Sequence, residues 1–140
     1  MKQIPVIFWT GTGNTQMMAD VIAAAINAAG AEAVVKNVSE ISADEAAGYA
    51  ALALGCPAMG AEVLEECEFE PFFTELEGKL AGKKVALFGS YGWGGSYMQD
   101  WEARVKDAGA ELVADGVLAL GAPDDEAEAK LAEAGKLLAE

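Results

Sequence analysis

The chain has no histidine and only two cysteines, Cys56 and Cys67, which lie apart in the sequence. Protein zinc sites are built from clustered Cys and His side chains, so this shortage excludes a zinc centre. Two cysteines are also too few for a disulfide scaffold. We expect both to be buried free thiols in a reducing cytoplasm.

Basic residues are scarce as well. Nine Lys and Arg against 23 Asp and Glu give a net charge of −14. Nucleic acids and anionic membranes both bind cationic surfaces, so neither is expected as a partner. The acidity can simply keep the protein soluble, or it can steer the protein toward a basic partner at a rate that falls with added salt. Charge alone does not distinguish the two.

Long apolar runs are also missing, since none approaches the roughly 20 residues that span a bilayer. The first residues enter a strand pattern almost at once, without the segments of a signal peptide. The chain has 140 residues and 53% hydrophobic composition. A chain of this length buries about two-thirds of its unfolded surface as one domain. We therefore expect a cytoplasmic protein with a single domain over residues 1–140.

What the chain does contain is an alternation of apolar runs and helical patterns. Strands are predicted at 4–9, 33–35, 49–55 and 84–88, and an interrupted one at 112–120. Pro5 lacks an N–H and should therefore stand at the very start of the first strand. The spacing of Ser42 and Glu45 predicts a capping box, and Asp124 should open the last helix. Strands buried on both faces and separated by helices predict an α/β three-layer sandwich around a five-stranded parallel sheet.

The first strand runs into a loop of two glycines, three threonines and an asparagine, without any Lys or Arg. Such a loop at a helix N-terminus can hold a phosphate through backbone N–H groups and hydroxyls. A Walker A loop would need a Lys after its second glycine, and the dinucleotide fingerprint would need a glycine where Gln16 stands. The alternative is an ordinary turn capped by Asn14 or Thr15. These six residues alone leave both interpretations open.

Two more unusual loops, residues 57–65 and 90–95, follow the third and fourth predicted strands. Ligands of parallel sheets bind beyond the carboxyl ends of the strands, so three such loops at one edge are far more specific than any one of them. Together these loops resemble the flavin-binding loops of the flavodoxins, and the stretches 68–73 and 82–88 are similar to short-chain, clostridial-type members. The resemblance spans essentially the whole chain. It implies strand order 2-1-3-4-5, which is known for flavodoxin.

The resemblance implies that non-covalently bound FMN is the cofactor. The phosphate loop would be Thr10, Gly11, Thr12, Gly13, Asn14 and Thr15. The second loop would be Pro57, Ala58, Met59, Gly60, Ala61 and Glu62, and the third Ser90, Tyr91, Gly92, Trp93 and Gly94. Trp93 and Met59 would cover the two ring faces, Glu62 would accept from the ring N3–H, and the peptide between Gly60 and Ala61 would flip toward the semiquinone N5–H.

Residue type alone also allows ordinary structural roles for these residues. Trp93 could fill a surface gap, Met59 could be plain core, and Glu62 could be a solvated carboxylate. The segment 94–98 is one residue shorter than in similar flavodoxins, which bears on the placement of Trp93.

The implied function is that of a low-potential one-electron carrier, cycling between oxidised, semiquinone and hydroquinone FMN, and not an enzyme. Its partners would be redox proteins with basic docking surfaces, such as reductases and ferredoxin-linked oxidoreductases, and the carrier itself a monomer. The alternative is an FMN-dependent NAD(P)H:quinone reductase. A signalling receiver domain is rejected, because Thr10, Cys56 and Gly121 stand where its acidic cluster, phosphorylated Asp and Lys would be needed.

Overall fold

A computed structural model describes residues 2–9, 13–57, 67–91, 96–120 and 122–140. The strands are β1 (Gln3–Phe8), β2 (Glu32–Asn37), β3 (Ala51–Gly55), β4 (Lys84–Tyr91), β5 (Glu111–Leu112) and β6 (Val117–Leu120). The helices are α1 (Asn14–Ala28), α2 (Ala43–Ala46), α3 (Phe69–Glu77), α4 (Ser96–Asp107) and α5 (Asp125–Ala139), with a short 3-10 helix, η1 (Val38–Glu40).

All described strand pairs are parallel, in the order β2-β1-β3-β4-β5, which confirms the predicted topology. The predicted interrupted strand is two short strands that share the fifth place. β5 pairs with the start of β4, and β6 pairs with its end. Between them the Gly116 N–H donates to the Glu102 carboxylate at 2.6 Å, so the interruption is stabilised by α4.

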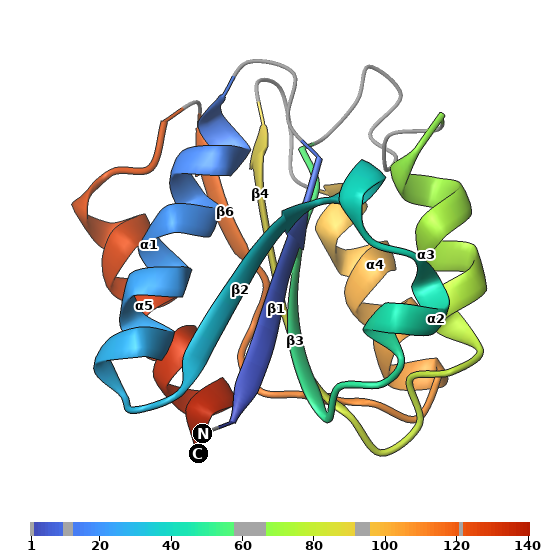
Figure 1. Cartoon of the computed structure of the whole chain (residues 1–140). Helices are drawn as coiled ribbons and strands as arrows, with labels where there is room; N and C mark the ends of the chain where they lie inside the picture. Colours follow the sequence, from blue (N-terminus) through green and yellow to red (C-terminus); the bar gives the residue numbers. More distant parts are fainter. Residues whose placement is uncertain (1, 10–12, 58–66, 92–95, 121) are drawn as a thin grey trace.

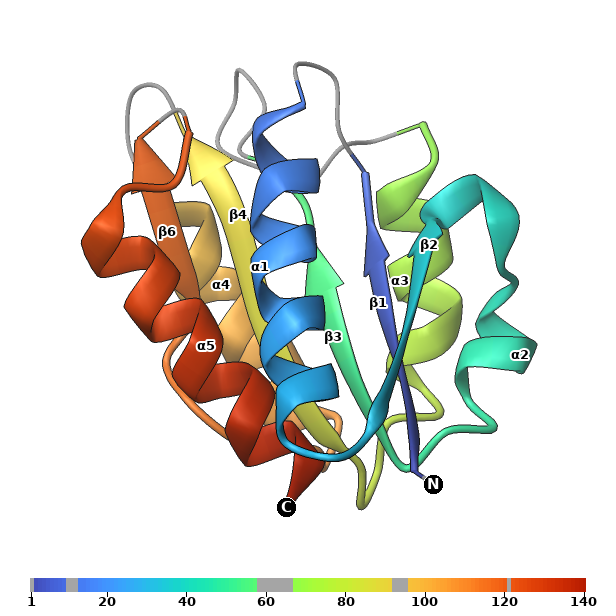
Figure 2. The same cartoon turned by 60° about the vertical axis from the view of Figure 1, so that its left-hand side comes forward.

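The sheet separates two layers of helices (Figures 1 and 2). Helices α1 and α5 pack on one face, while α2, α3 and α4 pack on the other. Each face has its own apolar core, because the strand side chains alternate between the two sides. Ile4 and Val6 belong to the α1/α5 core, whereas Ile7 and Leu54 belong to the other. The three-layer α/β/α prediction is therefore confirmed.

Pro5 lies inside β1 and not at its very start, where its missing N–H had predicted it. It is the third residue of the strand and pairs with Val34 of β2. Pairing of β1 with β3 on the other side begins only at Val6. The prediction that Pro5 stands at the very start of the strand was wrong, because what matters is the start of pairing on the N–H side and not the start of the strand.

β4 is longer than predicted. The glycine-rich sequence was expected to end it at Phe88, but the strand continues through Gly89 and Ser90 to Tyr91. Its extra residues pair with β6, in a register that matches Phe88 with Val117 and Tyr91 with Leu120. A second strand alongside therefore supplies the hydrogen bonds that offset the low strand preference of glycine.

Helix capping follows the sequence closely at two places. The Ser42 hydroxyl accepts from the Glu45 N–H and the Glu45 carboxylate reaches back to the Ser42 N–H, which is the predicted capping box. Asp124 caps α5 by accepting from the Ala127 N–H at 2.8 Å. The cysteines are both free of disulfides, but Cys67 is exposed and only Cys56 is buried. The prediction of two buried thiols was wrong for Cys67 because it lies in a turn just before α3 and not in an apolar strand.

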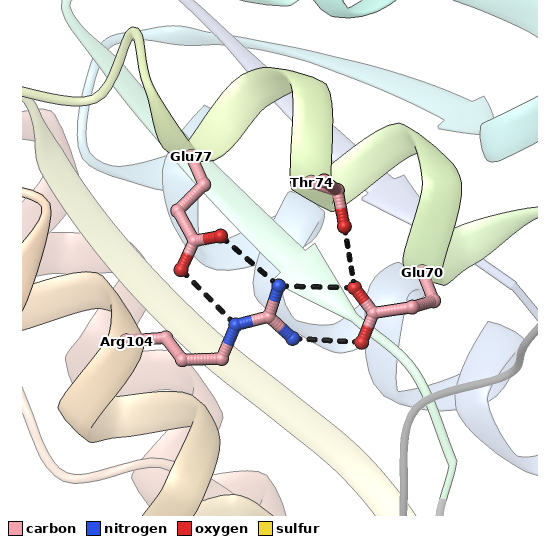
Figure 3. A network of polar contacts seen from close by, with 4 residues as sticks. All are labelled: Glu70, Thr74, Glu77 and Arg104. Atoms are coloured by element: carbon pink, nitrogen blue, oxygen red, sulfur yellow. Dashed lines mark hydrogen bonds and ion pairs between the residues drawn. The ribbon is translucent and has the colours of Figure 1, made fainter.

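A partly buried ion-pair network joins α3 to α4 (Figure 3). Arg104 of α4 reaches between two carboxylates of α3, donating to Glu70 at 2.7 and 2.9 Å and to Glu77 at 3.0 and 3.1 Å. Thr74 adds a hydrogen bond to Glu70, and the guanidinium lies 4.7 Å from the ring centre of Phe73. Hydrogen bonds from Arg104 lower the pKa of Glu70. The network fixes how these two helices lie against each other.

Candidate functional site

The three strands that precede the predicted flavin loops are neighbours in the sheet, and their carboxyl ends lie at one edge. β1 ends at Phe8, β3 at Gly55 and β4 at Tyr91. Backbone hydrogen bonds continue just past these ends, from the Trp9 N–H to the Gly55 carbonyl at 3.0 Å and from the Cys56 N–H to the Phe88 carbonyl at 3.1 Å. The chain segments that enter the three predicted loops are thus held side by side.

Six predicted site residues fall in the described part of the chain: Gly13, Asn14, Thr15, Pro57, Ser90 and Tyr91. The other eleven lie outside the described residues. They are Thr10, Gly11, Thr12, Ala58, Met59, Gly60, Ala61, Glu62, Gly92, Trp93 and Gly94.

Gly13 is the N-cap of α1, in the left-handed region with φ +93°. A β-carbon there would meet nothing within 4 Å, so the positive φ, and not a lack of space, is what favours glycine at this position. Gly13 has no side chain with which to cap α1, and the first turn of this helix, within the described residues, contains no acidic residue. The prediction that Asn14 or Thr15 would be the N-cap of an ordinary turn is therefore wrong in its cap, which is Gly13. The partial positive charge at the N-terminus of this 15-residue helix suits a phosphate.

Thr15 and Ser90 connect the first predicted loop to the third. Their hydroxyl oxygens lie 3.3 Å apart, and the residues are only 1% and 6% exposed. Thr15 stands in the first turn of α1 and Ser90 near the end of β4. Whichever hydroxyl donates within this pair, the other keeps its proton for a ligand, which is the neutral donor that a phosphate site without basic residues requires.

Tyr97 connects the third predicted loop to the second. Its hydroxyl donates to the carbonyl of Cys56 at 2.8 Å, and both residues are buried. Burial raises the pKa of Tyr97, so its hydroxyl stays protonated and remains a donor. Cys56 is the residue immediately before Pro57, at which the second predicted loop begins.

A third side-chain contact connects the first predicted loop to the far end of the second. The indole N–H of half-buried Trp9, the residue just before Thr10, donates to the Glu68 carboxylate at 3.2 Å. For each pair of predicted loops, described residues in or beside the loops are therefore joined by a side-chain hydrogen bond. Side-chain hydrogen bonds thus connect the segments that surround the candidate site.

The described residues fit an FMN phosphate. They provide a helix N-terminus, a left-handed glycine as its N-cap and two buried hydroxyls. Hydrogen bonds to a charged group are worth about 1.5–3 kcal/mol each, so several neutral donors can hold a dianion without a cationic side chain. Elsewhere in the described ranges, no group of three or more His, Cys, Asp or Glu side chains is placed to hold a metal ion.

Comparisons with known proteins agree with this geometry. The flavodoxin family model matches residues 6–135. The chain is 48% identical to the flavodoxin of Clostridium beijerinckii over 135 residues, which cover 96% of this chain and 97% of that one. The chain belongs to the flavodoxin family. This flavodoxin is also 47% identical to that of Megasphaera elsdenii over 116 residues, covering 82% and 85% of the two chains.

The solution structure of two-electron reduced Megasphaera elsdenii flavodoxin superposes with a TM-score of 0.89, at 44% identity over 97% of this chain and 98% of that one. The flavodoxin fold and the FMN cofactor predicted from the sequence are confirmed by these relationships. So is the function of an electron-transfer protein and not an enzyme, and nothing in these relationships supports the quinone reductase alternative. None of the helices within the described ranges has the length and apolarity needed to cross a bilayer.

Sequence reasoning missed the residues beside the predicted loops that connect these loops to one another. Tyr97, Trp9 and Glu68 were not assigned any role at the site, although each touches a residue that flanks a predicted loop. Tyr97 and Trp101 are spaced one helical turn apart and read as ordinary core residues. A signal for Trp9 was available, because it directly precedes the predicted phosphate loop.

Proposed function

We propose that this flavodoxin is a low-potential, one-electron carrier that works as a single FMN-binding domain over residues 1–140. The observation that carries the proposal is the buried Thr15–Ser90 hydroxyl pair at the N-terminus of α1, whose N-cap is left-handed Gly13. These features provide an anion site made of neutral donors. FMN, when bound, supplies the one-electron redox chemistry.

The phosphate would be held by Thr10, Gly11, Thr12, Gly13, Asn14 and Thr15. The flavin ring would lie along two further segments: Pro57, Ala58, Met59, Gly60, Ala61 and Glu62, and Ser90, Tyr91, Gly92, Trp93 and Gly94. Met59 and Trp93 would exclude water from the ring faces, and Glu62 would orient the ring by accepting its N3–H. The described anchors Pro57, Ser90 and Tyr91 lie at the ends of neighbouring strands, which supports this arrangement.

Low potential follows from the surroundings. A ring shielded from water in a protein of net charge −14 resists any added negative charge. The same charge favours partners with basic docking surfaces, such as reductases and ferredoxin-linked oxidoreductases, and disfavours nucleic acids and membranes. We further propose that the carrier is a cytoplasmic monomer.

A Thr15→Val variant tests the site. It keeps the shape of the side chain but removes the hydroxyl beside Ser90. FMN should bind roughly tenfold more weakly, because one hydrogen bond to a charged group is lost, whereas riboflavin, which lacks the phosphate, should bind as before. Thr74→Val is the matched control, because Thr74 donates to Glu70 on α3 and lies outside the proposed site. Equal weakening of riboflavin and FMN by Thr15→Val would contradict a phosphate site at α1.

A further inference from the structure

We infer that Tyr97 is a positioning residue for the flavin ring, because its buried hydroxyl holds the peptide from which the predicted ring-binding segment starts. The inference rests on the function proposed above. It concerns residues on three different elements: Cys56 and Pro57 after β3, Gly89 in β4, and Tyr97 in α4.

The contact itself is short and sheltered. The Tyr97 hydroxyl lies 2.8 Å from the Cys56 carbonyl oxygen, and the two residues are 2% and 0% exposed. Water cannot compete at such a site, so a hydrogen bond there is stronger than one at the surface. A buried carbonyl that loses its partner is also costly. The Cys56 carbonyl therefore has a strong preference for the position that Tyr97 defines.

Holding this carbonyl sets the direction of the chain. The Cys56 carbonyl belongs to the planar peptide that joins Cys56 to Pro57, so fixing its oxygen fixes the plane. The ring of Pro57 then restricts the next torsion to a φ of about −65°. The Cys56 N–H, on the preceding peptide, is held by the Phe88 carbonyl at 3.1 Å. Two consecutive peptides are thus oriented where the chain leaves the sheet toward Ala58.

Gly89 makes room for the contact. A β-carbon at this position would lie 2.1 Å from the Cys56 oxygen and 2.1 Å from the Tyr97 hydroxyl oxygen. Any other residue would push these two oxygens out of their places. Gly89, which follows four apolar residues in β4, is therefore matched to the Tyr97–Cys56 hydrogen bond.

The aromatic ring of Tyr97 is held in turn by the core. It is stacked near Trp101, with ring centres 6.5 Å apart. Trp101 contacts Phe69 edge-on at 5.5 Å, and Phe69 is the first residue of α3. One aromatic cluster on α4 consequently contacts the chain on both sides of residues 58–66: at Cys56 where the chain leaves the sheet and at Phe69 where α3 begins.

The test is a Tyr97→Phe variant, which keeps the ring and its packing and removes only the hydroxyl. The FMN-free protein is titrated separately with FMN, riboflavin and inorganic phosphate, and binding is followed by calorimetry. Riboflavin and FMN should each bind about tenfold more weakly and by the same factor, since the loss falls on the ring segment. Phosphate binding should stay within about twofold of wild type. Gly89→Ala, which disturbs the same hydrogen bond from β4, should show the same pattern.

Asn27→Ala is the control for a general loss of stability. It removes a hydrogen bond from the Ala33 N–H at the opposite edge of the sheet and should leave the binding of all three ligands unchanged. Unchanged riboflavin binding by Tyr97→Phe, or equal weakening of phosphate binding, would overturn the positioning role. A wild-type protein that binds none of the three ligands would instead overturn the proposed site itself, and the inference with it.

Discussion

The ring of Phe88 lies directly against the backbone of Gly55, its partner in the adjacent strand. A β-carbon on Gly55 would come within 2.1, 2.3 and 2.7 Å of three ring carbons of Phe88. Both residues are fully buried, so the ring has no free space into which to move. A small residue in β3 is thus required by a large one in β4, immediately below the edge where the cofactor is expected.

Gly55→Ala should therefore destabilise the protein by about 1–3 kcal/mol or more, the cost of overpacking a core. Urea unfolding measures the loss. Gly78→Ala is the matched control, because Gly78 has φ −73° and open space around its α-carbon. That change should be neutral or stabilise the protein by about 0.4–1 kcal/mol, since alanine restricts the unfolded chain. Equal unfolding midpoints for the two variants would contradict the close contact.

Gly13→Ala and Gly30→Ala should be equally destabilising but differ in FMN binding. Both glycines have positive φ, +93° and +95°, and neither has a neighbour within 4 Å of a β-carbon. Each alanine should cost about 1–2 kcal/mol of backbone strain. Gly13 belongs to the proposed phosphate site, whereas Gly30 follows the other end of α1. Only Gly13→Ala should therefore weaken FMN binding, as measured by calorimetric titration. Similar FMN affinities for both variants would argue against a phosphate at this helix end.

The Glu70–Arg104 pair should contribute stability that depends on pH. The folded protein lowers the pKa of Glu70 through hydrogen bonds from Arg104. The stabilisation is therefore complete above the unfolded pKa of Glu70 and is lost as the pH falls through the lower folded value. Glu70→Gln should be less stable than wild type at pH 7, by at most about 1 kcal/mol because both side chains are partly exposed. The two proteins should converge once the pH lies below the lowered, folded-state pKa of Glu70.

Thermal unfolding from pH 7 to pH 3 follows this convergence. Glu126→Gln serves as its control, because Glu126 pairs with Lys130 at the surface, where the two side chains are 78% and 62% exposed. That variant should unfold with the wild-type pH dependence. A constant difference between Glu70→Gln and wild type across the range would show that the carboxylate charge is not what stabilises the α3–α4 contact.

The acidic charge should govern how small oxidants reach the reduced protein. With a net charge of −14, the protein attracts a cationic oxidant such as hexaamminecobalt(III) and repels anionic ferricyanide. Added salt screens both interactions. Stopped-flow oxidation should therefore become slower with salt for the cobalt complex and faster for ferricyanide. Rates that do not respond to salt for either oxidant would mean that the field near the cofactor is not negative.

Much of the architecture could be predicted because the pattern of apolar residues reflects burial directly. The failures came where a partner strand or neighbour, invisible in the local sequence, overrides the local preference. β4 continues through Gly89 because β6 lies beside it, and Pro5 is tolerated inside β1 because β3 pairs only from Val6 onward. The local sequence carries no information about which strand will pair alongside.

The candidate site divides in the same way. Glycine, threonine and asparagine in one short loop predict a phosphate site, because the donors of such a site come from residues adjacent in the sequence. Tyr97 could not be found by such reasoning, because its role depends on Cys56, 41 residues away in the sequence, and on the absence of a side chain at Gly89. Supporting contacts of this kind become visible only in three dimensions.

The different settings of the two cysteines give the protein a ready-made attachment point. Cys56 is sealed in the core, whereas Cys67 faces solvent two residues before α3. A thiol-specific dye should therefore label the folded protein at one position without mutagenesis. Because Cys67 adjoins the second predicted loop, the fluorescence of the attached dye should change when the cofactor binds or is released.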